Sequence, residues 1–248
     1  MKILTLNTWQ EKGPWQKRWE ITFEGMRRYQ PDVAAFQEVF SRSWAEEVRR
    51  RTGFAELVYP EPASGLMVLS RYPVSKSECH TMKTQSPTED YLRYAVFAEL
   101  KTGRGNFSLF NTHLSWKLEE GAVREKQVEE LIHFVETKSG GSEAMAMGDF
   151  NSPPESSEIR KMIVLGKFVD TYKACHPKDK GITWDNRNPY AASASVALPD
   201  RRIDYVFVRN PGHVLGRLRS AEILFTQPDQ EGVYASDHYG VMVEYDGI

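Results

Sequence analysis

Short apolar segments that end on polar side chains constrain the fold more than any other feature of this sequence. Their length and alternation are typical of β-strands rather than helices. Strands are expected at residues 2–6, 33–36, 66–69, 94–100, 106–112, 144–147, 203–208, 221–225 and 241–245. The turn Gly103-Arg104-Gly105 joins two of these segments and predicts an antiparallel hairpin. The chain therefore contains sheets that are not purely parallel.

Three segments have helical periodicity instead. They cover about 14–29, a stretch that begins after the N-cap candidate Ser41 and ends near Gly53, and about 118–137. Strands outnumber these helices, which predicts an α/β fold of two packed mixed β-sheets flanked by helices. No internal repeat, low-complexity tract or linker interrupts the 248 residues. We therefore expect residues 1–248 to form a single domain.

The charge balance excludes one class of function and leaves others open. The net charge is −2 and the isoelectric point about 6.3, so the strongly basic surface of a non-specific nucleic-acid binder is missing. A phosphate-rich substrate is still compatible, because a bound divalent metal supplies local positive charge. No apolar run approaches the roughly 20 residues of a membrane span, and the first ten residues resemble a strand rather than a signal peptide. We expect a cytoplasmic protein without stable membrane insertion, and a monomer by default.

Polar side chains at the strand ends form the candidate site. They are Asn7, Glu38, His113, Asp149, Asn151, Asp204, Asp237 and His238. Strand ends of packed sheets converge on one rim, so these side chains are expected to share a pocket. Oxygen ligands with some imidazole, and no thiolate, suit Mg²⁺ or Mn²⁺ better than structural zinc.

Each of these residues also has an ordinary structural explanation. An aspartate after a strand is more often a turn former or a helix cap, and Glu38 alone could be a solvated carboxylate. His113 alone would more often be a core histidine with its hydrogen bonds satisfied. Asp204 lies within an otherwise apolar segment, where a buried carboxylate needs a partner. The occurrence of all of them together, each at a strand end, favours a functional site.

The order of these motifs resembles the endonuclease/exonuclease/phosphatase superfamily. The matching segments are Leu6-Asn7-Thr8-Trp9, Phe36-Gln37-Glu38-Val39, Asn111-Thr112-His113-Leu114, Gly148-Asp149-Phe150-Asn151, Arg202-Ile203-Asp204-Tyr205 and Ser236-Asp237-His238. The resemblance spans residue 3 to about 245. It implies a deoxyribonuclease I-like fold, which is a four-layered α/β sandwich.

The resemblance implies a divalent-metal-dependent phosphoester hydrolase, with metal ligands on one side of the site. Glu38 would be the principal ligand of Mg²⁺ or Mn²⁺, with Asn7 and Asp237 as supporting ligands. Asp149 would align or activate the attacking water, and Asn151 would hold a phosphate oxygen. Such hydrolysis requires an oriented water, a Lewis acid and a route for protons.

The resemblance places the remaining groups around the phosphate. Asp204 and His238 would form a carboxylate–imidazole pair, and His113 would stabilise the transition state or protonate the leaving oxygen. Family nucleases have a glutamate beside this first histidine, and residues 60–65 offer only Glu61. The charge state of His113 at work is therefore left open.

Three further residues are expected to bind substrate. Arg93 matches a family phosphate-binding arginine. Trp184 and Asn186 lie in Thr183-Trp184-Asp185-Asn186, which resembles a segment of the neutral sphingomyelinase and tyrosyl-DNA phosphodiesterase 2 branches of the family. Trp184 would form a wall of the pocket, although a packing tryptophan in a loop explains it equally well.

Three functions are compatible with these motifs. The first is a phosphodiesterase acting on a small-molecule or lipid-headgroup ester. The second is an endonuclease, exonuclease or DNA-end-processing enzyme, which would need a local basic groove. The third is a non-catalytic binding module on the same scaffold, which is disfavoured because every core catalytic position is filled. A deep aromatic pocket, to which Trp9 and Trp116 could contribute, would favour the first.

Overall fold

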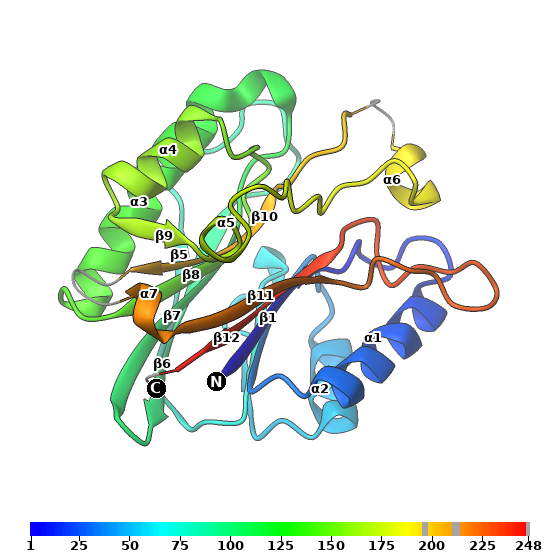
Figure 1. The fold of residues 1–248 in the computed structure, drawn as a ribbon, viewed down its shortest axis with the longest axis horizontal. Coiled ribbons are helices and arrows are strands. Elements are labelled where there is room, and N and C mark those ends of the chain that lie inside the picture. Colours follow the sequence, from blue (N-terminus) through cyan, green and yellow to red (C-terminus); the bar gives the residue numbers. More distant parts are fainter. Residues whose placement is uncertain (195–197, 210–213, 247–248) are drawn as a thin grey trace.

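Two six-stranded mixed sheets pack face to face in the computed structural model, which describes residues 1–194, 198–209 and 214–246 (Figure 1). The first sheet has the order β11-β12-β1-β2-β4-β3. Its strands are β1 (Lys2–Asn7), β2 (Val33–Gln37), β3 (Glu56–Val58), β4 (Met67–Ser70), β11 (Leu218–Leu224) and β12 (Gly240–Tyr245). Only β1 and β2 pair in parallel among these strands.

The second sheet has the order β5-β6-β7-β8-β10-β9. Its strands are β5 (Val74–Thr81), β6 (Tyr94–Thr102), β7 (Gly105–His113), β8 (Ala144–Asp149), β9 (Phe168–Asp170) and β10 (Asp204–Arg209). The expected hairpin is confirmed as β6 and β7, and β7 pairs with β8 in parallel. Each sheet thus combines one parallel pair with antiparallel neighbours, as the prediction of mixed sheets required.

Helices cover the outer face of each sheet. On one side lie α1 (Trp15–Tyr29) and α2 (Arg42–Thr52), and on the opposite side lie α3 (Gly121–Ser139) and α4 (Ser157–Val164) (Figure 1). The short helices are η1 (Pro62–Ser64), η2 (Leu118–Glu120), α5 (Thr171–Cys175), α6 (Pro189–Ala192) and α7 (Val214–Arg217). The predicted four-layered sandwich is confirmed.

Side-chain alternation along the strands separates the apolar cores. In β1, Ile3 faces the space between the sheets, whereas Leu4 and Leu6 pack under the helices α1 and α2. Trp19 of α1 is buried in this second core, and Trp15 packs against it from the same helix. Because the period of a strand is two, a slip of one residue would exchange these faces.

Polar side chains lie between the sheets immediately below the strand ends. The Gln37 Nε2 donates to Asn111 Oδ1 at 2.7 Å and to Thr5 Oγ1 at 3.0 Å. The Asn111 amide in turn donates to the backbone oxygen of Phe36 at 2.9 Å. These bonds join β2 to β7, so they fix the position of one sheet relative to the other at this end of the sandwich.

No helix among the described residues is long and apolar enough to cross a membrane.

Candidate active site

Strand register in the second sheet brings three of the predicted residues into one row. His113 on β7 lies opposite Asp149 on β8, and Asp149 lies opposite Asp204 on β10. The three strands are adjacent, and the row falls at the end of each or one residue from it. Residues far apart in the sequence thus become direct neighbours through backbone pairing alone.

Gly148 is required for this row. Its φ is +131°, and a Cβ at this position would lie 2.0 Å from the backbone oxygen of Thr112. No side chain fits in that space, so only glycine allows β7 and β8 to approach closely beside His113 and Asp149.

Asp149 is the centre of the site. Its Oδ2 accepts a hydrogen bond from Asn7 Nδ2 at 3.0 Å, and its Oδ1 accepts one from the backbone N–H of Asn151 at 2.9 Å. The same Oδ2 lies 3.4 Å from His113 Nε2 and 3.7 Å from His238 Nε2. Burial raises the pKa of Asp149 to about 7, with the charge of Asp204 acting in the same direction and that of His238 against it. This carboxylate can therefore exchange a proton near neutral pH.

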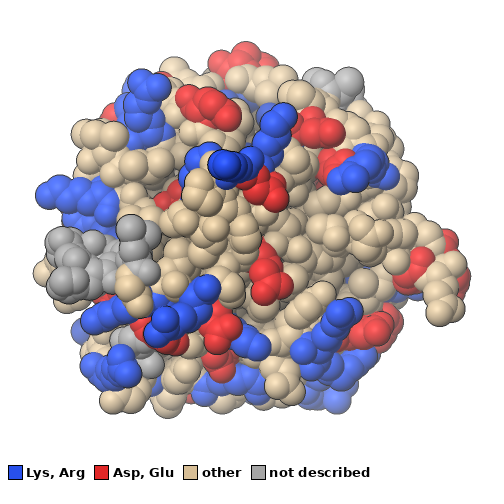
Figure 2. Space-filling model, viewed as in Figure 1, with Lys and Arg blue, Asp and Glu red and all other residues tan. Residues whose placement is uncertain are grey.

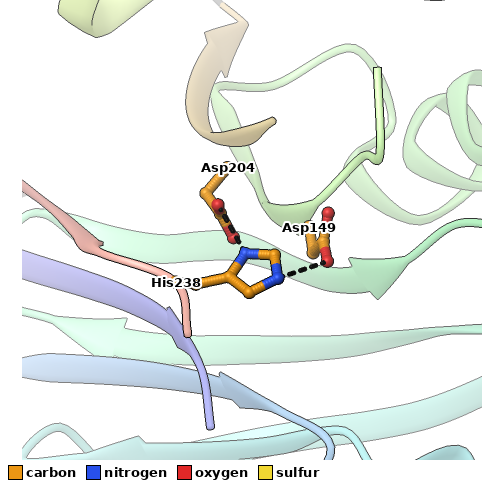
Figure 3. A group of neighbouring side chains, drawn as sticks. All are labelled: Asp149, Asp204 and His238. Atoms are coloured by element: carbon orange, nitrogen blue, oxygen red, sulfur yellow. Dashed lines mark hydrogen bonds and ion pairs between the residues drawn. The ribbon is translucent and has the colours of Figure 1, made fainter. Parts of the chain in front are cut away.

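His238 lies between two carboxylates (Figure 3). Its Nδ1 is 2.9 Å from Asp204 Oδ2, and its Nε2 faces Asp149. Burial opposes a charge on the ring, but the negative charges of Asp204, Asp149 and Asp237 outweigh it and raise the pKa of His238 to about 10. His238 is therefore an imidazolium over the neutral pH range.

His113 has the opposite electrostatic environment. Burial lowers its pKa well below the usual value, and the positive charges of Arg93 and His238 add to this effect. This environment favours the neutral imidazole form of His113. Glu61 accepts a hydrogen bond from the backbone of Ala63 at 3.0 Å and caps the short helix η1, so its carboxylate is engaged there.

Carboxylates and an amide of the first sheet face the same space. Glu38 has a left-handed backbone with φ of 64°, and Gly65, whose added Cβ would lie 3.2 Å from the Glu38 Cα, allows this conformation. The Asn7 Nδ2 reaches Glu38 Oε1 at 3.3 Å as well as Asp149. Burial raises the pKa of Asp237 to about 6, with a further contribution from the charge of Glu38. Asn7 therefore connects the two sheets across the site.

The donor set fits a divalent metal. Among the described residues, no lysine or arginine forms an ion pair with Glu38, Asp149 or Asp237, so their negative charges are compensated only in part, by histidine. Asp149, Asp204 and His238 also offer ligand atoms that lie within 4.8 Å of one another. One oxygen of Asp204 is buried without a hydrogen-bond partner, a costly arrangement unless a ligand or solvent reaches it. This cluster could therefore hold a metal ion through its carboxylates, and through His238 only when the ring is neutral.

A cavity of about 520 Å³ opens above these groups, a size typical of small-molecule sites. Trp9 and Tyr190 stack with ring centroids 4.8 Å apart and form one wall. Trp184 forms another and meets the His238 ring edge-on at 5.0 Å. Trp116 also lines the cavity, so aromatic side chains surround the acidic floor.

Two residues predicted to bind substrate do not line the cavity. Arg93 is buried outside the cavity lining, where its guanidinium forms an ion pair with Glu89 at 2.7 Å. The amide of Asn186 donates to Asp200 Oδ1 at 2.7 Å and to the backbone oxygen of Leu198 at 2.8 Å, and Asn186 does not line the cavity. Trp184 is the one of the three that borders the cavity.

Several lining residues have no signal in the sequence analysis. They are Gln10, Lys12, Glu89, Asp90, Tyr91, Lys117, Tyr190, Ser193, Ala194, Leu198 and Arg201. Most lie in irregular segments between helices and strands, where no periodicity marks them. Arg201 is the exception that the sequence could have revealed, because it stands only three residues before Asp204.

A four-layered α/β sandwich with a buried carboxylate–imidazole cluster at its strand ends defines the deoxyribonuclease I-like class of hydrolase folds. This chain belongs to the endonuclease/exonuclease/phosphatase family, because residues 18–238 match the sequence pattern that defines this family. The resemblance seen in the motifs is therefore confirmed.

Proteins named tyrosyl-DNA phosphodiesterase 2 are among those that this chain resembles. The chain is 23% identical over 261 residues to tyrosyl-DNA phosphodiesterase 2 of Gallus gallus, covering 98% of this chain and 67% of that protein. The fold matches D. rerio TDP2 complexed with single strand DNA product with a TM-score of 0.83 and 16% identity, covering 100% and 99% of the two chains. It also matches a functionally unknown conserved protein from Enterococcus faecalis V583 with a TM-score of 0.79 and 18% identity, covering each chain completely.

Proposed function

We propose that this protein is a divalent-metal-dependent phosphodiesterase that activates water for in-line attack on phosphorus. The observation that carries the proposal is the environment of Asp149. Its carboxylate lies within reach of His113, His238 and the amide of Asn7 in one cavity, and burial raises its pKa toward the neutral range. A base with a pKa near the working pH is the most effective at proton transfer.

Each side chain then has a separate task. Glu38, Asn7 and Asp237 are the groups to hold Mg²⁺ or Mn²⁺, which when bound would neutralise charge on the phosphate. Asp149 accepts the proton of the attacking water. His238, kept charged by Asp204, donates from Nε2 toward the phosphate, and the neutral His113 donates a hydrogen bond to an oxygen that gains charge.

Asn151 completes the phosphate-binding surface of the cavity. Its backbone has a φ of 51°, and its Nδ2 donates to the backbone oxygen of Leu114 at 3.0 Å. This bond fixes the rotamer, so the second amide hydrogen of Nδ2 has a defined direction. The side chain can therefore donate to a phosphate oxygen without rearrangement, in agreement with the role that the family resemblance implies.

A nucleic-acid end with an aromatic adduct is the substrate that we favour over a lipid headgroup. Although an aromatic pocket alone favours a small-molecule or lipid-headgroup ester, the stacked pair of Trp9 and Tyr190, with Trp116 and Trp184, also suits the rings of a base or a tyrosyl group, and base–aromatic stacking contributes about 1–3 kcal/mol per base. The likeness to tyrosyl-DNA phosphodiesterase 2 and to a TDP2 structure with a DNA product supports the same choice. On the face shown in Figure 2, basic and acidic side chains are interspersed, which disfavours a broad non-specific track for duplex DNA.

A substrate panel with matched variants tests both levels of the proposal. The protein is assayed with Mg²⁺, with Mn²⁺ and with EDTA on bis-p-nitrophenyl phosphate, p-nitrophenyl phosphate, sphingomyelin, unmodified single-stranded DNA and 5′-tyrosyl DNA. We expect metal-dependent turnover of the diester and the fastest turnover of 5′-tyrosyl DNA. Asp149→Asn should abolish most activity, whereas Asp32→Asn, far from the cavity, should leave it unchanged.

The outcomes separate the reaction from the substrate. Turnover of monoesters alone would overturn the phosphodiesterase assignment. Turnover of sphingomyelin far above that of 5′-tyrosyl DNA would retain the reaction and replace the substrate with a lipid-headgroup ester. Binding of these compounds without turnover in either metal would indicate a binding module.

A further inference from the structure

Arg201 is a lining residue of the cavity that none of the motifs includes. Its backbone is fixed against the Trp184 wall, since its N–H donates to the Trp184 oxygen at 3.0 Å and its oxygen accepts from the Trp184 N–H at 2.9 Å. It shares the cavity with Asp149, Asn151 and His238. The backbone of Arg201 is thus paired with that of Trp184, and both residues line the same cavity.

The guanidinium of Arg201 is buried without a counter-ion. The residue is only 7% exposed, and its Nε is fully buried with no hydrogen-bond partner. Burial lowers its pKa, and the negative charges of Asp149 and Asp204 counteract this effect from nearby. Within residues 1–194, 198–209 and 214–246, no carboxylate pairs with it. A buried cation in this state is unfavourable unless an anion completes its hydrogen bonds.

The other buried arginines near the cavity are already engaged. Arg18 donates to the backbone oxygens of residues 8, 9, 10, 12 and 235, and it thereby holds the loop that carries Trp9. Arg93 donates to Glu89. Arg18 uses all three of its guanidinium nitrogens, and Arg93 is paired outside the cavity lining, whereas Arg201 lines the cavity with its Nε unpaired.

We infer that Arg201 binds a non-bridging oxygen of the scissile phosphate, the role that the sequence assigned to Arg93. This inference rests on the proposed phosphodiesterase function, since it concerns the substrate of the same cavity. Planar guanidinium groups match two phosphate oxygens at once. The phosphate would then contact Arg201 and Asn151 on one side and the acidic, metal-binding groups on the other, which would orient phosphorus toward Asp149.

Titration of inorganic phosphate tests the inference without relying on turnover. Calorimetry is performed on the Mg²⁺-loaded protein, on Arg201→Gln and Arg201→Lys, and on Arg104→Gln, which removes the same charge from an exposed turn. Hydrogen bonds to charged groups are worth about 1.5–3 kcal/mol, so Arg201→Gln should weaken phosphate binding on the order of 10- to 100-fold. Arg201→Lys should recover part of the affinity, and Arg104→Gln should bind like the unaltered protein.

The same variants are assayed on bis-p-nitrophenyl phosphate, with circular dichroism to verify folding. Loss of phosphate affinity in Arg201→Gln, together with a raised KM, supports the inference. Equal phosphate affinity in the unaltered protein and both Arg201 variants overturns it, and so does the absence of phosphate binding by the unaltered protein. If Arg201→Gln does not fold, the comparison of Arg201→Lys with the unaltered protein decides. Failure of the proposed function is a different result, namely phosphate binding that depends on Arg201 with no diester turnover by any protein.

Discussion

The pair of Asp204 and His238 provides the strictest test of the electrostatics in this site. In Asp204→Asn, the side chain keeps its shape and the carboxylate charge is removed. The Asp204 Oδ2 lies 2.9 Å from the His238 Nδ1, and both residues are buried. At this distance two unit charges interact by about 6 kcal/mol with an effective dielectric constant of roughly 20. This energy corresponds to roughly four pKa units at about 1.4 kcal/mol each.

The sign of the effect follows from the direction of the pKa shift. The pKa of His238 is raised to about 10, so the imidazolium is present below that pH and is lost as the pH rises through it. Without Asp204, only Asp149 and Asp237 still oppose the effect of burial, so the pKa should fall by several units toward its ordinary value of 6.5. At pH 8 the variant would then have a neutral His238, and its turnover should fall by about 10²–10⁴-fold.

Two measurements check this prediction. The alkaline limb of the kcat/KM profile on bis-p-nitrophenyl phosphate should move down by several pH units in Asp204→Asn. NMR titration of labelled histidine should show the same displacement for the His238 ring. Asp32→Asn is the control, because its carboxylate also accepts a hydrogen bond, a partly buried one from the Lys2 N–H at 2.7 Å, but outside the cavity. Turnover within about threefold of the unaltered protein would refute the reasoning, as would an unchanged His238 pKa.

Three further predictions concern other parts of the site. Activity should decrease as the pH drops below about 7, because the Asp149 carboxyl, with its pKa raised to about 7, is then already protonated and cannot accept a proton from water. A decrease that begins only near pH 4 would contradict this role. Glu38→Gln should weaken Mn²⁺ binding by about 10- to 100-fold in calorimetry, since a charged ligand is lost, and unchanged affinity would exclude Glu38 as the main ligand. Gly148→Ala should lower the free energy of unfolding by about 3 kcal/mol through strain and clash with the Thr112 oxygen, as measured by urea denaturation. Gly103→Ala, at an open turn, is its matched control and should change stability by less than about 0.5 kcal/mol.

The sequence predicted the layers because the central strands have strong physical signals. Residues 33–36 and 144–147 are uninterrupted apolar runs, and they are found at β2 and β8, buried on both faces. The strand β5 gave no such signal. It is an edge strand whose residues are largely exposed and polar, so alternation is absent from its sequence. The strands β3 and β9 contain only three residues each, too few for any period to be visible.

The site, too, was predictable only where its residues lie at the ends of regular strands. Its floor could be predicted, because Asn7, Asp149 and Asp204 terminate or begin regular strands and the register then brings them together. Its walls could not, because Tyr190 and Glu89 lie outside the regular strands and become neighbours of the floor only through tertiary packing. Arg93 is present at the expected place, but it pairs with Glu89 and does not line the cavity, which the sequence could not show.

The Asn7 amide, which donates to Asp149 from the opposite sheet, makes the reaction dependent on the alignment of two separately hydrogen-bonded layers. Misplacement of reacting groups by about 1 Å is enough to cost roughly 100-fold in rate. The turnover rate should therefore report on how accurately the two sheets are aligned with each other. On warming, or after substitutions in the apolar core between the sheets, the turnover rate should decrease before the circular dichroism signal of the two sheets is lost.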